Sequence, residues 1–297
     1  MNDIILEIQS KISSKILLNY DMGQSTWFRT GGKAKGYCIV NNLKDLKTIV
    51  SYSDQIKYYI IGVGSNLLVR DSGFDGLIIK LGREFNKIEL SNNILSVGAA
   101  VLDLNLSKFA LKNSIKDFEF FSGIPGTVGG AVKMNAGCYG SQTSDNLKRV
   151  LVINELGKIK FINIGDLKLG YRTSNISDKT IILQAEFKYE YSSQEEIIYK
   201  NNSIKTKREK SQPLKEKTSG STFKNPPGQY AAELIEKAGC KGIKVGDASV
   251  STIHANFIIN NGNANATDIE NLGNIMVKKV KESFGINLEW EIKVLGK

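Results

Sequence analysis

The sequence predicts an α+β protein, because short strand-like runs dominate it and a few longer stretches have helical spacing. The strand-like runs are rich in β-branched and aromatic residues and are separated by Gly and Asn-Asn turns, which is typical of tightly connected strands. The helical stretches carry apolar residues three or four positions apart. No internal repeat or low-complexity linker is visible, and 297 residues suffice for two domains of ordinary size.

The N-terminal part predicts helices and strands in alternation. Residues 1–20 begin with Ile side chains at helical spacing, so we expect a helix and then a loop. Residues 37–50 predict a strand that leads into a helix, with Asn41 and Asn42 available as caps. The expected elements that follow are short strands at 58–62, 67–69, 77–81, 88–90 and 94–97, and a helix at 102–113.

The second half begins with a glycine-rich segment and then continues with both kinds of element. The expected strands lie at 149–154, 158–163, 180–189, 255–260 and 288–295. The expected helices lie at 194–210 before Pro213, at 228–239 with prolines before it and Gly239 at its exit, and at 267–283 with Gly285 as its cap. In the last strand, Leu288, Trp290, Ile292 and Val294 would share one face, and Glu289, Glu291 and Lys293 the other.

Composition is that of a globular protein, with 41% hydrophobic and 24% charged residues. The net charge is +10, but the positive residues are mostly Lys scattered among acids, without an Arg-rich stripe. We therefore expect no nucleic-acid partner, while a basic surface suits an enzyme whose ligands carry phosphates. No apolar run approaches the ~18–20 residues that cross a bilayer, and no basic segment precedes an apolar stretch at the N-terminus. Neither membrane insertion nor secretion is expected.

Cysteine and histidine usage narrows the chemistry. Cys38, Cys138 and Cys240 are far apart and form no CxxC, which argues against a disulfide framework and a thiolate metal site and favours a cytoplasmic location. The single histidine, His254, excludes a His-rich metal site, so we expect no metal. Any catalytic acid must come from another residue type, which is tolerable when a cofactor performs the difficult step.

The segment GVGSN, residues 62–66, follows a predicted strand and invites comparison with nucleotide-binding turns. It lacks the third glycine of GxGxxG, and the segment after it is strand-like, so the helix N-terminus of a Rossmann site is missing. The chain also lacks the GxxxxGK[ST] pattern of P-loop kinases. Taken alone, this turn is better interpreted as a structural hairpin.

A second segment, SGIPGTVGGAVKMNAG at 122–137, has glycines at 123, 126, 129, 130 and 137. Such density lets the backbone approach a ligand closely and present successive N–H groups to a phosphate. The alternative is a tight, buried turn. Because ordering many glycines without a packing benefit is costly, we favour a pyrophosphate cradle.

Together the two segments resemble the FAD-binding half of the UDP-N-acetylenolpyruvoylglucosamine reductase family, and the wider match runs from about residue 24 to 296. The resemblance implies an FAD-binding domain of two α+β subdomains, like those of PCMH and vanillyl-alcohol-oxidase flavoproteins, plus a smaller α+β substrate-binding domain. The implied FAD-binding domain is 1–203, joined by a C-terminal strand at 287–297, and the implied substrate-binding domain is 204–286.

Matched position by position, the resemblance also implies the cofactor contacts. These are Gly62, Gly64, Ser65, Asn66, Gly123, Ile124, Pro125, Gly126, Thr127, Gly129, Gly130, Asn135, Ala136 and Gly137, while Thr30, Gly31 and Gly32 match an early family segment. Some relatives attach flavin to His or Cys. Here the only His lies far downstream and the first turn contains no Cys, so we expect noncovalent FAD.

Three more segments match the same family and imply its catalytic residues. YRTS contains Arg172, GSTFKNP contains Ser221, and LEWEIKVLG contains Glu291. Each alone is more ordinarily a surface residue, a turn former or a solvent-facing strand residue. Their order and spacing relative to the two glycine segments favour the functional interpretation.

The family reaction explains these residue types. NADPH passes hydride through FAD to the vinyl carbon of an enolpyruvyl ether on a UDP-sugar, which places negative charge next to a carboxylate. Arg172 would pair with that carboxylate and its developing enolate. Ser221 would protonate the alpha carbon, because the enolate is basic enough for a hydroxyl to act as its acid. Glu291 would orient or share a proton near the same carbon.

For the UDP-sugar, the resemblance points to Arg208, Gln212, Lys224, Asn225 and Tyr139. The stretch between Arg172 and Arg208 is too short for the tyrosine-bearing loop of one family subtype, so Tyr189 and Tyr191 receive no role. His254 is expected to be structural.

The expected function is reduction of UDP-N-acetylglucosamine enolpyruvate in peptidoglycan precursor synthesis, with NADPH as co-substrate. The alternatives are another FAD oxidoreductase of the wider superfamily and a basic nucleic-acid-binding protein. The segments GSTFKNP and LEWEIKVLG distinguish the reductase hypothesis from the hypothesis of another FAD oxidoreductase, because the wider superfamily does not need them.

Overall fold

The computed structural model describes residues 2–297, which form two compact units. Unit 1 contains the chain up to Asn19, Lys35–Gly62 and Gly76–Lys207, and unit 2 contains Tyr20–Ala34, Val63–Asp75 and Arg208–Lys297. The chain therefore passes from one unit to the other several times. The domain boundaries expected from the sequence remain a prediction.

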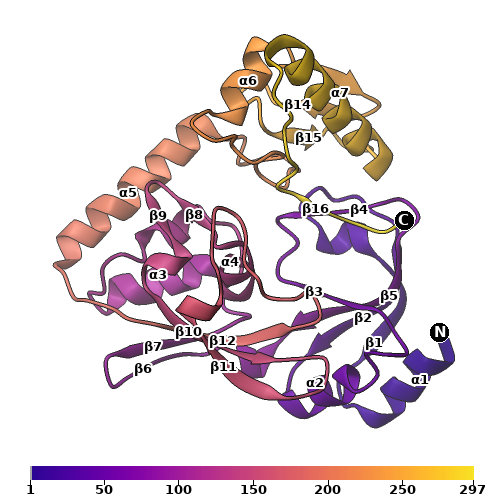
Figure 1. Ribbon diagram of the computed structural model, residues 1–297, viewed down its shortest axis with the longest axis vertical. Helices are drawn as coiled ribbons and strands as arrows, with labels where there is room; N and C mark the ends of the chain where they lie inside the picture. The colour runs from indigo at the N-terminus through magenta and orange to yellow at the C-terminus, as the bar shows by residue number, and fades with distance from the viewer. Residues whose placement is uncertain (1) are drawn as a thin grey trace. The chain divides into compact units, whose positions relative to one another are not determined.

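The first sheet of unit 1 has four strands in the order β1-β2-β5-β3, with β3 and β5 parallel (Figure 1). The elements around it are α1 (Asn2–Lys11), β1 (Ile16–Asp21), β2 (Lys33–Val40), α2 (Leu43–Val50), β3 (Tyr58–Ile61) and β5 (Phe74–Leu81). The predicted cap is confirmed at Asn42, whose side-chain oxygen accepts from the N–H of Asp45 at 2.8 Å.

Strand β1 corrects the expectation of a loop after the first helix. Only Ile16 of this strand is buried, so the sequence carries no alternation of apolar and polar residues that would indicate a strand. The strand forms through its pairing with β2, which a local pattern does not reveal.

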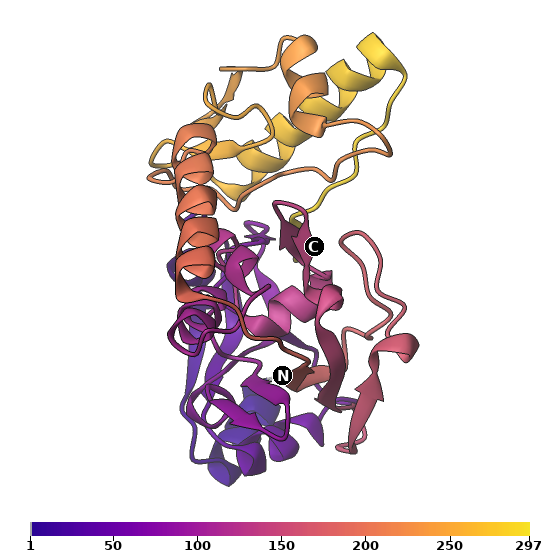
Figure 2. The same ribbon diagram turned by 90° about the vertical axis from the view of Figure 1, so that its left-hand side faces the viewer.

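The second sheet of unit 1 has five antiparallel strands in the order β11-β10-β12-β7-β6. The elements of this half are β6 (Ile88–Ser91), β7 (Ile94–Gly98), α3 (Asp103–Lys112), α4 (Val128–Met134), β8 (Gly137–Cys138), β9 (Ser141–Gln142), β10 (Leu147–Ile153), β11 (Ile159–Asn163), β12 (Ile181–Phe187) and α5 (Gln194–Ser211). Helix α5 is uninterrupted (Figure 2), and its last residues, from Arg208, belong to unit 2.

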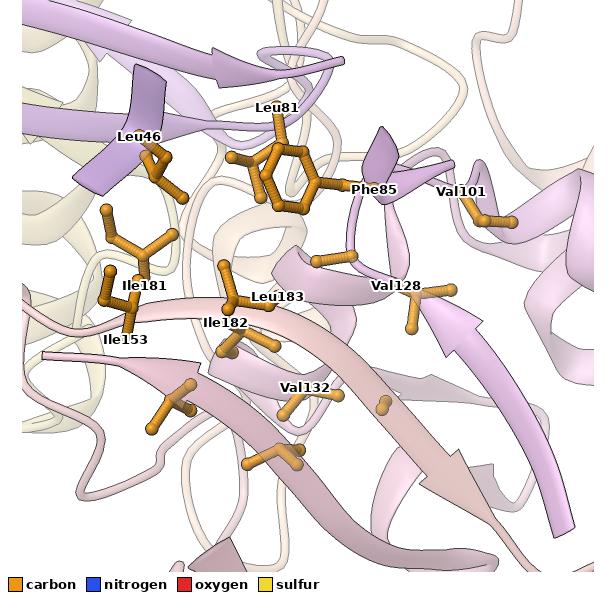
Figure 3. Packing of buried hydrophobic residues seen from close by; sticks show 14 of the residues in the cluster. Leu46, Leu81, Phe85, Val101, Val128, Val132, Ile153, Ile181, Ile182 and Leu183 are labelled. Carbon is orange, nitrogen blue, oxygen red and sulfur yellow. The ribbon is translucent and has the colours of Figure 1, made fainter. Parts of the chain in front are cut away.

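One hydrophobic cluster joins both sheets of unit 1 and the helices beside them. Leu46 from α2, Val132 from α4 and Ile182 from β12 belong to it, as the close view shows (Figure 3). The short helices η2 (Arg83–Phe85), η3 (Glu119–Gly123), η4 (Thr143–Asp145) and η5 (Ile164–Asp166) connect the elements of this unit.

Helix α4 lies within the glycine-rich segment that we expected to be a loop. Val128, Ala131 and Val132 are buried at helical spacing, and the helix contacts β12 and β7. The two glycines between them are poor helix formers and hide the pattern, so tertiary packing rather than propensity makes this helix.

Unit 2 has its own hydrophobic cluster, made by Phe28, Leu68 and residues from 223 onward. Its elements are η1 (Met22–Ser25), β4 (Leu67–Val69), α6 (Ala231–Lys237), β13 (Lys244–Val245), β14 (Ala248–Val250), β15 (Ile258–Asn260), α7 (Ala266–Phe284) and β16 (Lys293–Leu295). Strands β13, β14 and β15 form an antiparallel sheet that contacts α7. Helix α7 ends at Gly285 in the left-handed conformation, as predicted. Within residues 2–297, none of the helices has the length and apolar character needed to span a membrane.

The final strand is shorter than the predicted 288–295. Only Lys293–Leu295 forms a strand, β16, which pairs in parallel with β4, and Trp290 makes a single bridge to Phe223. The predicted alternation still describes the burial, since Leu288 and Ile292 are buried and Glu289 is exposed. Before β16 the chain makes only the bridge of Trp290 and bends at Ile292, so no regular ladder forms there.

Asp103, at the start of α3, is an unusual member of the unit 1 interior. It is completely buried, and neither carboxylate oxygen has a hydrogen-bond partner among residues 2–297. Burial raises the pKa of this carboxyl well above its ordinary value, because the ionised form is poorly solvated in the interior. The unfolded chain has lost this proton above its ordinary pKa of about 4, so stability falls as pH rises, by about 1.4 kcal/mol per pH unit until the folded pKa is reached.

We expect Asp103→Asn to remove this dependence. In urea unfolding, the free energy of unfolding of the variant should rise relative to that of the wild type as the pH is raised from about 5 to about 8. Equal pH slopes in both proteins would contradict a raised pKa of Asp103.

Asp45 supplies the matched control. Burial acts to raise its pKa, but hydrogen bonds from Ser13 and Ser14 outweigh it and lower the pKa to about 2. This carboxylate is ionised in both folded and unfolded chains over that pH interval, so the stability that it contributes is lost only in acid. Asp45→Asn should therefore lose similar stability at both pH values.

Candidate active site

The two glycine segments meet in unit 1 at Gly62 and Thr127. A Cβ on Gly62 would lie 2.6 Å from the Thr127 hydroxyl oxygen, which is too close for any side chain. Thr127 is buried and directly precedes α4. The end of β3 and the start of α4 are thereby packed together, and both belong to segments expected to hold the cofactor.

The rest of the first turn, Val63 to Asn66, belongs to unit 2. Gly64 has a φ of +69°, and a Cβ there would lie 1.9 Å from the main-chain oxygen of Ser25. Its own carbonyl accepts from the N–H of Trp27 at 3.0 Å. In the described chain, the N–H groups of Gly64, Ser65 and Asn66 donate to no protein acceptor. Consecutive unpaired N–H groups are the donor set that binds phosphate oxygens, so this turn fits a cofactor with a pyrophosphate.

The early segment with Thr30, Gly31 and Gly32 packs against the strand after this turn. The N–H of Gly32 donates to the carbonyl of Arg70 at 3.1 Å, and a Cβ on Gly32 would lie 2.3 Å from the Asp71 oxygen. This close packing explains glycine at that position without a ligand.

Close packing also explains most glycines of the second segment. A Cβ would lie 2.7 Å from Cys138 Sγ at Gly123, 2.5 Å from Asp103 Oδ2 at Gly126, 3.0 Å from the Ala99 Cβ at Gly129 and 2.4 Å from the Ser141 oxygen at Gly137. Only Gly130 faces open space, with the Thr127 hydroxyl 3.7 Å away. The inference that these glycines bring no packing benefit is therefore wrong. They allow the backbone of the segment to fold tightly.

Asn135 fixes the exit of this segment. It ends α4 in the left-handed conformation at φ 41°, and its side chain is buried. The side chain donates to the carbonyl of Gly170 at 3.1 Å and accepts from the N–H of Ser144 at 2.9 Å. Its polar atoms therefore support the loop. Ile124, Pro125 and Ala136 of the same segment are half-buried, and their expected cofactor contacts stay predictions.

Arg172 lies beside the end of the second glycine segment in unit 1. Its guanidinium donates to the carbonyl of Gly137 at 2.8 Å and sits 4.9 Å from the ring centre of Tyr171. Arg172 has a φ of +56°, and Tyr139, two residues after Gly137, has a φ of +54°. The Lys207 ammonium lies 5.9 Å from the ring centre of Tyr139. Lys207 was not among the predicted residues, because nothing but its position before Arg208 distinguishes it.

In unit 2, Ser221 and Glu291 lie on neighbouring segments. The N–H of Glu291 donates to the carbonyl of Thr222 at 2.8 Å, and the N–H of Lys224 donates to the carbonyl of Glu289 at 2.8 Å. These bonds set the segments GSTFKNP and LEWEIKVLG side by side, although 70 positions separate Ser221 from Glu291. No local pattern in either segment predicts this pairing.

The expected substrate residues of unit 2 have polar partners within the protein. The Lys224 ammonium lies 3.2 Å from a carboxylate oxygen of Glu289, and the Asn225 side-chain oxygen accepts from the N–H of Ala231 at the start of α6 at 3.0 Å. At the end of α5, Arg208 Nε donates to the side-chain oxygen of Gln212 at 3.3 Å.

His254 takes part in the support of this region. Its Nδ1 accepts from the N–H of Asn256 at 3.3 Å, and burial lowers the pKa of its imidazole. Asn256 in turn bonds both main-chain groups of Phe223, at 3.0 and 2.8 Å. Sequence reasoning missed Asn256, whose only signal is its place beside the single histidine. Residues 2–297 contain no group of three His, Cys, Asp or Glu side chains arranged to hold a metal ion.

Comparison with protein families matches both parts of the chain. Residues 34–163 match the model of an FAD binding domain, and residues 212–295 match the C-terminal domain of UDP-N-acetylenolpyruvoylglucosamine reductase. The reductases of that name from Rickettsia typhi and Rickettsia conorii are 44% and 42% identical to this chain over 280 residues, which are 94% of this chain and 95% of each relative.

Comparison with solved structures points to the same family. The UDP-N-acetylenolpyruvylglucosamine reductase of Thermus caldophilus has a TM-score of 0.83 and 35% identity, covering 95% of this chain and 99% of that one. Wild-type Phl p 4.0202, a glucose dehydrogenase, has a TM-score of 0.50 and 10% identity over 65% of this chain and 44% of that one, which is a likeness of fold alone. The predicted α+β flavoprotein fold is confirmed, and the chain belongs to the UDP-N-acetylenolpyruvoylglucosamine reductase family.

Proposed function

We propose that this protein reduces UDP-N-acetylglucosamine enolpyruvate to UDP-N-acetylmuramate for peptidoglycan synthesis, with NADPH as electron donor and noncovalently bound FAD. The observation that carries the proposal is a set of hydrogen bonds in unit 2 that joins three segments matching the family. The turn with Asn66, the segment with Ser221 and the segment with Glu291 are joined through Thr222 and Lys293. Three free cysteines support a cytoplasmic location.

Two features of the chain suit FAD. The unpaired N–H groups of Gly64, Ser65 and Asn66 would bind its pyrophosphate, and the open side of Gly130 leaves room at the start of α4. Bound FAD would accept hydride from NADPH and supply it to the vinyl carbon. The protein's own residues must then hold the substrate and manage charge and protons.

Arg172 would supply the positive charge. Its guanidinium is held by the Gly137 carbonyl, and a fixed cation stabilises an enolate better than a mobile one, because no reorganisation is needed as charge develops. Ser221 would protonate the alpha carbon, and Glu291 would orient or share that proton. The main chains at Ser221 and Glu291 are held by hydrogen bonds to neighbouring segments.

Positive side chains would hold the diphosphate. Lys224 and Arg208 supply charged donors, and the exposed Glu289 would be exchanged for a phosphate oxygen when substrate arrives. The wider superfamily reading, in which the substrate is an alcohol or hydroxy acid, does not account for the match of 212–295 to the reductase C-terminal domain.

NADPH oxidation with and without the enolpyruvyl UDP-sugar tests the function. We expect rapid oxidation only when the sugar is present, with one UDP-N-acetylmuramate formed per NADPH consumed. An unchanged rate on addition of the sugar, or oxidation without that product, would refute the proposal.

The mode of FAD binding can be tested separately. The first glycine turn contains neither His nor Cys, so acid precipitation of the yellow protein should release all flavin into the supernatant. Colour that stays with the denatured chain would show a covalent bond.

Ser221→Ala should separate the two half-reactions. Reduction of the flavin by NADPH needs no proton from Ser221 and should keep its rate, whereas reoxidation by the enolpyruvyl substrate should slow by about 10²–10³-fold. Stopped-flow absorbance of the flavin measures both. If Ser221 merely shapes the turn before Phe223, both steps will slow together or reoxidation will stay normal.

A further inference from the structure

Asn66 makes two hydrogen bonds to the segment that carries Glu291. Its side-chain Nδ2 donates to the main-chain oxygen of Glu291 at 3.2 Å, and its main-chain oxygen accepts from the N–H of Lys293 at 3.1 Å. The two bonds span the buried Ile292 and lead directly into the parallel pairing of β4 with β16, where Leu67 lies opposite Lys293. Asn66 therefore holds the main chain of this segment at Glu291 and at Lys293.

The peptide groups of Glu291 are fixed from both sides. Its N–H donates to Thr222, the residue after Ser221, and its carbonyl accepts from Asn66, the last residue of the glycine turn. Both bonds use the main chain, so they set the position from which the Glu291 side chain extends. A carboxylate that must meet a reacting carbon depends on that position, since a displacement of about 1 Å can cost about 10²-fold in rate.

We propose that Asn66 is a positioning residue for Glu291, which extends the role of this residue beyond the cofactor contact expected for its turn. The proposal rests on the proposed function for the role of Glu291. An amide suits the position because one nitrogen can donate to the Glu291 carbonyl, which an ionised carboxylate cannot do. Aspartate at position 66 would keep the size of the side chain and set a negative charge against that carbonyl.

The two rival roles of Asn66 make different predictions. A pure cofactor contact would weaken FAD binding and leave the reoxidation rate per bound flavin unchanged. A general stabilising role would slow both half-reactions together. A positioning role affects only the step that uses Glu291.

The test compares Asn66→Asp with Asn261→Asp in FAD-loaded protein. Asn261 is a matched control in the same unit, because its Nδ2 also donates to a main-chain carbonyl, that of Asp247 at 2.9 Å, away from the segments of the site. In Asn66→Asp we expect flavin reduction by NADPH within about twofold of wild type and reoxidation by the enolpyruvyl sugar slowed by about 10–10²-fold, with little change in KM. Asn261→Asp should leave both rates unchanged.

A double-mutant cycle then shows whether Asn66 acts through Glu291. In a Glu291→Gln background, Asn66→Asp should slow reoxidation by less than about twofold, because the group that it positions is already lost. Multiplying effects, equal slowing of both half-reactions, or lower FAD content with normal reoxidation per flavin would each overturn the proposal.

Hydrogen exchange provides a readout that needs no substrate. Asn66→Ala removes the side-chain bond to the Glu291 carbonyl and keeps the main-chain acceptor of Lys293. The amides of Glu291 and Lys293 should then exchange faster than in wild type, because the segment opens more often, while the amides of α7 keep their rates. Unchanged exchange at both Glu291 and Lys293 would overturn the proposal. If the wild-type protein fails to reduce the sugar, the proposed function is refuted. The exchange experiment still tests whether Asn66 stabilises this segment.

Discussion

The parallel pairing of β4 with β16 is the constraint on which the arrangement of unit 2 depends. Residues 67–69 and 293–295 are more than 220 positions apart, yet their pairing joins the glycine turn to the end of the chain. Parallel strands cannot be joined by a hairpin, so everything between them must form a returning connection. The hydrophobic cluster that includes Leu68 and Ile292 stabilises this pairing, and Ser221 and Glu291 take their places relative to it.

The glycines of the two loops show how packing and ligand binding share one sequence signal. At Gly64 a Cβ would meet the main-chain oxygen of Ser25 at 1.9 Å, and at Gly62 and Gly126 it would meet side-chain oxygens at 2.6 and 2.5 Å, so packing favours glycine before any ligand is considered. The same tight folding leaves the N–H groups of Gly64 to Asn66 without protein acceptors. Close packing therefore generates the donor set that suits a phosphate, and the two explanations of these glycines are not rivals.

Local sequence patterns predicted the elements whose causes are local. The strand at 67–69 follows from a short run of apolar residues, and the cap at Asn42 and the helix end at Gly285 follow from capping chemistry within a few residues. Helix α4 was missed because Gly129 and Gly130 mask its buried face. Strand β1 was missed because it buries only one side chain and depends on its neighbour.

The candidate site likewise has parts that a local sequence pattern predicts and parts that it does not. The glycine turns and the catalytic candidates could be named from motifs, because each motif is contiguous in sequence. The contacts between motifs could not be predicted, since Asn66 and Glu291 are 225 positions apart and no local property of either residue specifies the partner. Asn256, which supports Phe223, lies in the stretch with His254 but received no role, and its support of Phe223 became visible only through its hydrogen bonds.

The scarcity of histidine gives these main-chain contacts their importance. His254 is half-buried, burial lowers the pKa of its imidazole, and its Nδ1 is engaged by the N–H of Asn256. It thus helps, through Asn256, to hold the segment that carries Ser221, and it brings no positive charge to that segment. Under the proposed function, the proton comes from a serine hydroxyl, which is a weak acid whose effectiveness depends on its distance and direction to the enolate. A protein that uses such an acid must fix the backbone around it, and the bonds of Thr222, Glu291 and Asn66 do so.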